Sequence, residues 1–340
     1  MIRPGVRQQR RGSRVLLFQL AKPVPDRPSP DKAPDWVHHG VMGFDAGTGA
    51  DSGQLPRPPH PWRRFVALGD SFTEGLDDPE PRNPGGYRGW ADRAAEELSV
   101  GVPEFSYANL AVRGLLLHEV VETQMGPALA LKPDLVSVQA GGNDLLHPGA
   151  DPDKLAGILE EAVVRLRLQD ITVVVFVGPD AGRSTIMGQF RSKIAVFNEN
   201  MRSIAEHHDA VVADLWAMTE LHDRRMWGPD RLHPSPLGHH AIAAMFLETL
   251  NVPHSLLPLA PKELPGRSWR QARVGDLVWA RDYFMPWVLR GIRRESPTGG
   301  FGPKRPVASP VPLPASGQAP ASDGQAPAPD SGAPGEATGG

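Results

Sequence analysis

The chain has 340 residues, 40% of them hydrophobic and 22% charged, which is typical of one substantial domain with room for a smaller second element. Its formal net charge of −3 argues against a global positive field for nucleic acid, and the absence of cysteine excludes disulfides, thiolate nucleophiles and cysteine-ligated metals. No apolar run approaches the ~18 residues that a membrane-spanning helix requires.

The first 62 residues are rich in Pro, Gly, Asp and Arg and lack sustained periodicity, so we predict a poorly ordered extension over 1–62. Five arginines precede an apolar run that stops at Lys22, which is too short for the core of a secretory signal. We therefore predict a cytoplasmic protein; the alternative is export through a twin-arginine signal at Arg10-Arg11.

Residues 63–252 alternate short apolar runs with longer amphipathic stretches, which predicts one folded domain with strands and helices in turn. The predicted strands are Phe65–Leu68, Phe105–Asn109, Leu135–Gln139, Ile171–Val177 and Val211–Asp214. The predicted helices are Tyr87–Leu98, Leu115–Leu131 (broken or bent at Gly126-Pro127), Asp153–Leu168, Gly188–His207 and Ser235–Leu250. This order predicts a parallel sheet covered on both faces, with ligands bound beyond the carboxyl ends of its strands.

Ser71 stands at the carboxyl end of the first predicted strand, in the sequence FVALGDSFTEG. A serine at that edge of a parallel sheet is a candidate nucleophile. An alcohol nucleophile needs a base to accept its proton, a group that orients the base, and donors for the oxyanion. The rest of the chain can be searched for these parts.

The loop that follows Ser71, from Phe72 to Gly89, carries four acidic residues, which are Glu74, Asp77, Asp78 and Glu80. We interpret it as a solvated loop whose Pro and Gly residues fix its path. The alternative is an acidic rim that selects neutral or cationic substrates. Tyr87 and Trp90 are predicted to pack beneath the loop.

Two later strand ends offer oxyanion donors. Gly114, in ANLAVRG after the second predicted strand, has an unhindered backbone N–H, and Asn143, in QAGGNDLL after the third, has a side-chain amide. Each feature taken alone is typical of an ordinary loop. Their occurrence at successive strand ends favours one shared site.

The candidate base is His233, in WGPDRLHPSPLGHH just before the last predicted helix, with Asp230 three residues earlier. This spacing lets one loop carry both groups, so that the carboxylate reaches the near ring nitrogen while the far nitrogen faces the nucleophile. The other histidine clusters, His207-His208-Asp209 and His239-His240, lack any metal-ligand spacing, so no metal and no cofactor are expected.

The C-terminal part divides into two segments. Residues 253–295 are predicted to form a basic amphipathic helical extension, since Lys262–Glu295 holds eight basic and four acidic residues and three tryptophans. We interpret this segment as docking on the main domain; the alternative is peripheral membrane or partner contact. Residues 296–340 are low in large apolar side chains and are predicted to be a disordered tail.

Four of these stretches together resemble the GDSL esterase/lipase family, also called SGNH hydrolases. GDSFTEG is similar to its first block, Asn109 and Gly114 to its second, GGND to its third, and Asp230-x-x-His233 to its last. The resemblance covers about residues 63–252. It implies a three-layer α/β/α flavodoxin-like sandwich with five parallel strands, as an α/β fold class.

The resemblance also implies roles for the site residues and an ester substrate. Ser71 would be the nucleophile, His233 the base and Asp230 its orienting partner, with Ser71, Gly114 and Asn143 as oxyanion donors. Asp70 and Asn109 would have supporting roles. The implied activity is a serine hydrolase that cleaves acyl or acetyl esters through an acyl-enzyme; the alternatives are an acyltransferase or thioesterase on the same fold, or a non-catalytic binding protein.

The competing α/β-hydrolase architecture is disfavoured, because Gly-x-Ser-x-Gly is absent around Ser71, where Thr73 replaces the second Gly, and GRSTIMG at 182–188 also fails. The substrate is expected to be a small ester and not nucleic acid, and the sequence leaves its acyl length and the oligomeric state open. Candidate pocket-lining residues are Asp180, Arg183, Met226 and Trp227.

Overall fold

The computed structural model describes residues 60–147, 149–180, 182, 187–261, 274, 278, 279, 281 and 301–311. The predicted N-terminal extension up to residue 59 lies outside the described residues. So do most of the predicted helical extension and most of the predicted tail.

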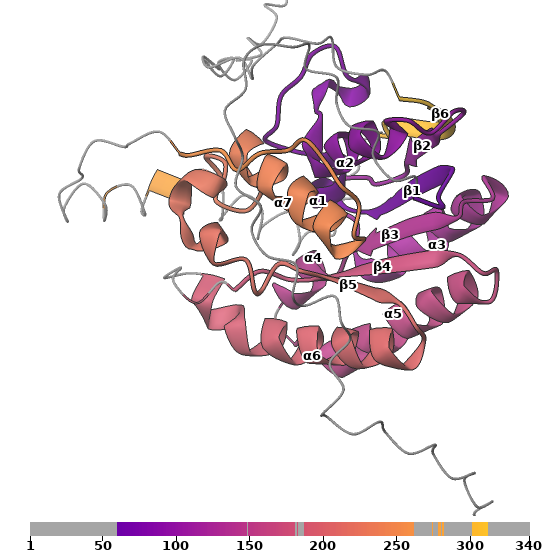
Figure 1. Ribbon diagram of the computed structural model, residues 1–340. Helices are drawn as coiled ribbons and strands as arrows, with labels where there is room; N and C mark the ends of the chain where they lie inside the picture. Colours follow the sequence, from indigo (N-terminus) through magenta and orange to yellow (C-terminus); the bar gives the residue numbers. More distant parts are fainter. Residues whose placement is uncertain are drawn as a thin grey trace, which may run out of the picture. The chain divides into compact units, whose positions relative to one another are not determined.

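The described strands form one six-stranded sheet in the order β5-β4-β3-β1-β2-β6 (Figure 1). The first five strands are parallel to one another, as predicted. The sixth is antiparallel to β2. The strands are β1 (Arg64–Gly69), β2 (Ser106–Asn109), β3 (Leu135–Gln139), β4 (Thr172–Val177), β5 (Val211–Asp214) and β6 (Arg305–Pro310).

Helices cover both faces of the sheet, because successive side chains of each strand point to opposite faces and both faces are apolar. Val66 and Leu68 of β1 pack in the core cluster that contains α3, α5 and α6, while Phe65 and Ala67 pack in the cluster that contains α2 and α7. The three-layer α/β/α fold class is therefore confirmed. The longer helices are α2 (Gly89–Ser99), α3 (Leu117–Ala130), α5 (Pro152–Arg167), α6 (Arg191–His207) and α7 (Pro236–Thr249).

Short helices sit at the turns near the carboxyl ends of the strands. They include α1 and α4, which were not predicted and are too short to show a helical pattern in the sequence. The short elements are α1 (Ser71–Glu74), η2 (Pro84–Gly86), α4 (Gly142–Leu145), η3 (Met187–Phe190), η4 (Thr219–His222) and η5 (Arg224–Met226).

The boundaries of all predicted strands and helices agree with the structure to within three residues. One internal feature differs. Helix α3 runs through Gly126-Pro127, where a break or bend was predicted. It ends at Ala130, so Pro127 removes a hydrogen bond only in the last turn, which is where that loss is least disruptive. Within the described residues, every helix is too short or too polar to cross a membrane.

Strand β6 corrects the predicted disorder of 296–340 for residues 305–310. Its backbone pairs with β2 in a register that places Ser106 beside Pro310 and Tyr107 beside Ser309. Proline is tolerated in such an edge strand, where one side of the backbone makes no ladder. A segment rich in proline and poor in large apolar side chains, which predicted disorder, can therefore still form a short edge strand.

Candidate active site

Ser71 is the first residue of α1, directly after β1. Asp70 caps this helix: its Oδ1 accepts the Phe72 N–H at 3.1 Å. Gly69 makes the close turn possible, since a Cβ at this position would lie 2.2 Å from the Gln139 carbonyl oxygen. The strand end thus places the Ser71 hydroxyl at the carboxyl edge of the sheet.

His233 lies within hydrogen-bond distance of both groups that the sequence analysis paired with it. Its Nε2 is 2.7 Å from Ser71 Oγ and its Nδ1 is 2.5 Å from Asp230 Oδ2. The other oxygen of Asp230 accepts the backbone N–H of Leu232 at 2.9 Å and of His233 at 3.0 Å. The loop before α7 therefore fixes the carboxylate and directs the ring at a serine 162 positions away.

The electrostatics of this pair favour a charged carboxylate beside a basic ring. Burial opposes ionisation of Asp230, but the hydrogen bond and charge of His233 outweigh it and lower the pKa of Asp230 to about 2. Burial also disfavours the imidazolium form of His233, yet the hydrogen bond and charge of Asp230 raise its pKa above the ordinary value. The ring is thus poised to take up a proton.

Asn143 belongs to α4, which follows β3. Its amide nitrogen donates to the Leu115 carbonyl at 3.0 Å and lies 3.3 Å from Asp70 Oδ2. Burial raises the pKa of Asp70 to about 7, against the opposing effects of the Phe72 N–H and His233. These contacts bring the third strand end next to the first.

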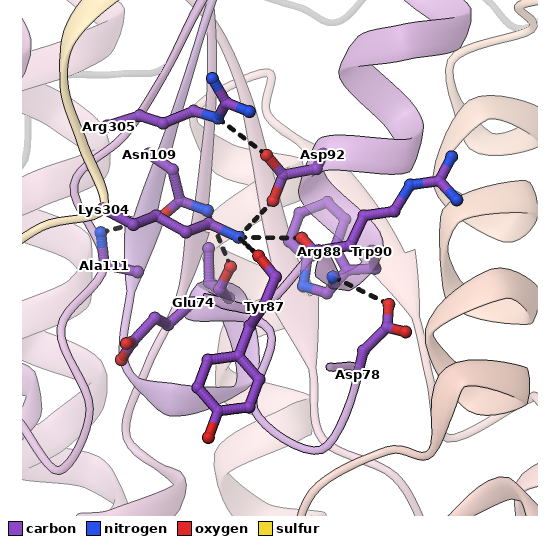
Figure 2. Close-up of polar contacts among 12 residues, drawn as sticks. Glu74, Asp78, Tyr87, Arg88, Trp90, Asp92, Asn109, Ala111, Lys304 and Arg305 are labelled. Atoms are coloured by element: carbon purple, nitrogen blue, oxygen red, sulfur yellow. Dashed lines mark hydrogen bonds and ion pairs between the residues drawn. The ribbon is translucent and has the colours of Figure 1, made fainter. Parts of the chain in front are cut away.

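Asn109 connects the second strand end to α1. Its amide nitrogen donates to the Thr73 carbonyl at 2.9 Å and to the Tyr107 hydroxyl at 3.0 Å, while its oxygen accepts the Ala111 N–H at 3.1 Å. Gly114 follows in the same loop with a φ of 79°. Asn109 therefore connects the loop that leads to Gly114 with α1 through its contacts with Thr73 and Ala111; Figure 2 shows its contact with Ala111.

Part of the acidic loop is buried, which corrects the favoured interpretation for Glu74 and Asp78, whereas residues 79–85 are mostly exposed. Glu74 forms an ion pair with Arg113, and Asp78 forms one with Arg93 at 2.7 Å with both side chains almost fully buried. Asp77 lies beside Asp230 and His233. Arginines from outside the loop neutralise Glu74 and Asp78, which is why these acids can enter the interior. Of the two aromatic residues predicted to pack beneath the loop, Trp90 is fully buried with its ring against Phe176 and Phe246, and Tyr87 is half-buried.

A second buried ionic cluster joins this loop to β6 (Figure 2). The Lys304 ammonium contacts the Asp92 carboxylate and donates to the carbonyls of Tyr87 at 3.2 Å and Arg88 at 2.8 Å. Arg305 donates to the other oxygen of Asp92 at 2.9 Å. Lys304 could not be predicted from the sequence, because nothing in a Pro-rich tail marks one lysine as an internal partner.

The four candidate pocket residues have different surroundings. Asp180, after β4, is paired with Arg191 through two hydrogen bonds of 2.6 and 3.0 Å. Met226 is buried in the core cluster of α2 and α7, so its side chain packs rather than lining an open pocket. Trp227 is half-buried and donates to the Leu221 carbonyl at 2.7 Å, and Arg183 lies outside the described residues.

One described residue of the predicted helical extension reaches the loop that carries Asp230. Trp279 is buried, and its indole N–H donates to the Asp230 carbonyl. The Arg231 guanidinium stacks over the same ring at 5.3 Å from its centroid. This contact favours docking for Trp279; the rest of the segment is too sparsely described to test either interpretation.

Comparisons with known proteins agree with the motif pattern. Residues 67–241, slightly more than half of the chain, match the model of the GDSL-like Lipase/Acylhydrolase family. A search of curated proteins gave no match.

Similar solved structures cover slightly more than half of the chain. The alpha/beta hydrolase LAE5 from the metagenome of Lake Arreo, Spain, is 21% identical, with a TM-score of 0.46 over 56% of this chain and 95% of that one. A lipase/acylhydrolase from Enterococcus faecalis is 20% identical, with a TM-score of 0.47 over 59% and 100%. A variant of Axe2, an acetyl xylan esterase from Geobacillus stearothermophilus, is 16% identical, with a TM-score of 0.46 over 56% and 95%.

Proposed function

Because the chain belongs to the GDSL-like lipase/acylhydrolase family, and is thus a carboxylic ester hydrolase, we propose that it cleaves acyl or acetyl esters through an acyl-enzyme on Ser71. The observation that carries this proposal is the continuous contact from Asp230 through His233 to Ser71, with 2.5 Å and 2.7 Å between the heavy atoms. This is the arrangement of acid, base and nucleophile that acyl transfer to a serine needs.

In the first half of the reaction, Ser71 Oγ attacks the ester carbonyl carbon while His233 Nε2 takes the hydroxyl proton. The carbonyl oxygen becomes an oxyanion, which the backbone N–H groups of Ser71 and Gly114 and the amide of Asn143 stabilise. His233 then protonates the alcohol oxygen as the carbon–oxygen bond to the leaving group breaks. The acyl group remains on Ser71.

In the second half, water replaces the alcohol. His233 takes a proton from water, whose oxygen attacks the acyl carbon, and the tetrahedral intermediate collapses as His233 returns the proton to Ser71 Oγ. Asp230 stays ionised throughout and stabilises the imidazolium that forms in each half. The lowered pKa of Asp230 supports this role.

The proposal is tested by labelling with a fluorophosphonate probe and by turnover of p-nitrophenyl esters of increasing chain length, beside acetylated sugars. Ser71→Ala should lose both labelling and turnover. The matched control is Ser203→Ala, because Ser203 also lies beside a histidine, with Oγ 3.3 Å from His207 Nδ1, but on the exposed side of α6. Labelling that persists in Ser71→Ala and disappears in Ser203→Ala would refute the assignment.

A further inference from the structure

Asp77 lies against the two residues that the proposed mechanism pairs. One carboxylate oxygen of Asp77, one of Asp230 and one ring nitrogen of His233 all lie within 4.8 Å of one another. Asp77 comes from the loop after α1, whereas the other two come from the loop before α7. Two carboxyl groups therefore face one imidazole.

The Asp77 carboxyl group closely approaches Gly228, two residues before Asp230. A Cβ on Gly228 would lie 1.9 Å from Asp77 Oδ2, so only glycine leaves room for this carboxyl group. That oxygen is shielded from solvent and has no hydrogen-bond partner among the described residues. The same carboxyl group has an oxygen within 4.8 Å of a carboxylate oxygen of Asp230.

Two carboxyl groups this close together favour a proton on one of them, because two carboxylates repel each other and can only accept hydrogen bonds. Burial, followed by the negative charge of Asp230, raises the pKa of Asp77 to about 7, although His233 opposes the rise. Asp230 and His233 are the titratable groups that face Asp77; Asp78, next to it in sequence, is paired with Arg93. The proton therefore belongs on Asp77.

We propose that Asp77 is a positioning residue of the site: its protonated carboxyl group donates to Asp230 and holds that carboxylate in place to receive the Nδ1–H of His233. This inference rests on the proposed function, which it deepens by adding a fourth group to the chain that ends at Ser71. Asp77 acts through Asp230 and does not touch the substrate.

The arrangement predicts a specific pH dependence. As the pH rises through the titration of Asp77, the donor is lost and a second negative charge repels Asp230. Asp230 is then less well held and His233 less well oriented, so kcat/KM should fall on the alkaline side. A side chain that donates at every pH should remove this fall.

The experiment compares Asp77→Asn, which keeps a donor, with Asp77→Ala, which has none, in the full chain. Glu80→Gln is the control, because it removes a carboxylate from the same loop at a site paired with the exposed Arg82. The readouts are kcat/KM for a p-nitrophenyl ester from about pH 5.5 to about pH 9.5, which spans the titration of Asp77, and the melting temperature of each variant.

We expect Asp77→Ala to lower kcat/KM about tenfold or more at about pH 6, the effect of one hydrogen bond to a charged group, and Asp77→Asn to restore most of it. The ratio of Asp77→Asn to wild-type activity should then rise with pH, while Glu80→Gln follows the wild type. If Asp77 had only a structural role, both Asp77 variants would lose melting temperature to the same extent. The ratio of Asp77→Asn to wild-type activity would then not change with pH.

Three results would overturn the inference while leaving the proposed function intact, provided that Ser71→Ala is inactive. They are wild-type activity in Asp77→Ala, an alkaline limb unchanged in Asp77→Asn, and activity that EDTA abolishes and a divalent cation restores. The last would assign Asp77, Asp230 and His233 to a metal ion. Turnover by Ser71→Ala would instead refute the proposed function itself.

Discussion

At the scale of single residues, the position of the Asn143 amide has a direct consequence for the rate of the proposed reaction. Its amide nitrogen is held between the Leu115 carbonyl and Asp70, next to the serine helix. As an oxyanion donor, it would strengthen its contact only when the carbonyl oxygen becomes charged. An interaction made mainly in the transition state affects kcat more than KM.

We therefore predict that Asn143→Ala lowers kcat by a factor that corresponds to about 3 kcal/mol of transition-state stabilisation, with little change in KM. Steady-state kinetics on a p-nitrophenyl ester measure both constants. Asn109→Ala is the comparison, because Asn109 positions the loops through three contacts and its loss should also lower the melting temperature. A kcat within about twofold of the wild type for Asn143→Ala would contradict the assignment of this donor.

The sequence could predict the residues that lie in short motifs at strand ends, and for a physical reason. Ser71 follows a buried strand directly, and Asp230 and His233 are close enough for one loop to hold both. Asp77 could not be predicted in the same way. Its partner lies 153 positions later in the chain, and an aspartate in an acidic, Pro- and Gly-rich loop is usually solvated.

At the scale of elements, β6 extends the sheet with a segment from outside the family-matched region. Strand composition alone did not indicate it, because Arg305–Pro310 contains two prolines and one large apolar residue. What holds it are pairing with β2 and the burial of Lys304 and Arg305 against Asp92. Contacts of this kind join residues about 200 positions apart and leave no local pattern in the sequence.

The buried pair of Lys304 and Asp92 makes a quantitative prediction. Both side chains are only 2% exposed, so removing the ammonium leaves a carboxylate that Arg305 alone must neutralise. We expect Lys304→Met to lower the free energy of unfolding by roughly 3 kcal/mol. Urea denaturation of the full chain measures this change.

The control for this prediction is Lys154→Met. Lys154 also pairs with an aspartate, at 3.8 Å from Asp151, but its side chain is 83% exposed, and an exposed pair contributes less than about 1 kcal/mol. Equal effects of the two substitutions would mean that β6 does not bury its lysine in solution. A further loss of kcat in Lys304→Met would show that β6 also supports the active-site loop.

At the scale of the whole molecule, the two-faced pattern of apolar residues was enough to predict the layers, since each strand must bury both of its faces. Stability as a function of pH depends instead on groups buried between layers. His239 of α7 is fully buried: its Nδ1 accepts the Trp90 N–H at 3.1 Å and its Nε2–H donates to the Leu76 carbonyl at 2.9 Å. Only the neutral ring satisfies both partners.

Burial lowers the pKa of His239 from 6.5 to about 4, against the smaller effect of Asp78. The unfolded chain, with the ordinary histidine pKa of 6.5, therefore binds a proton between pH 6.5 and about 4 that the folded chain does not. The neutral His239 therefore contributes its full stabilisation above pH 6.5, the pKa in the unfolded chain. This contribution is lost as the pH falls towards about 4, the pKa in the folded chain. The pKa values of Asp70 and Asp77 rise from 3.8 to about 7 on folding. Their contribution to stability therefore changes in the opposite direction and decreases as the pH rises between those two values.

Because the pH dependences of these groups oppose each other, the contribution of His239 is measured by comparing the wild type with His239→Gln. The glutamine amide can accept and donate hydrogen bonds but does not titrate. We predict that the difference in unfolding free energy between the two proteins shrinks by roughly 3 kcal/mol from about pH 7 to about pH 4. Urea denaturation at closely spaced pH values measures it, with the exposed His118→Gln as the control that should parallel the wild type. A difference that stays constant over this range would mean that His239 titrates equally in the folded and unfolded chains, and that its two backbone partners do not hold it neutral.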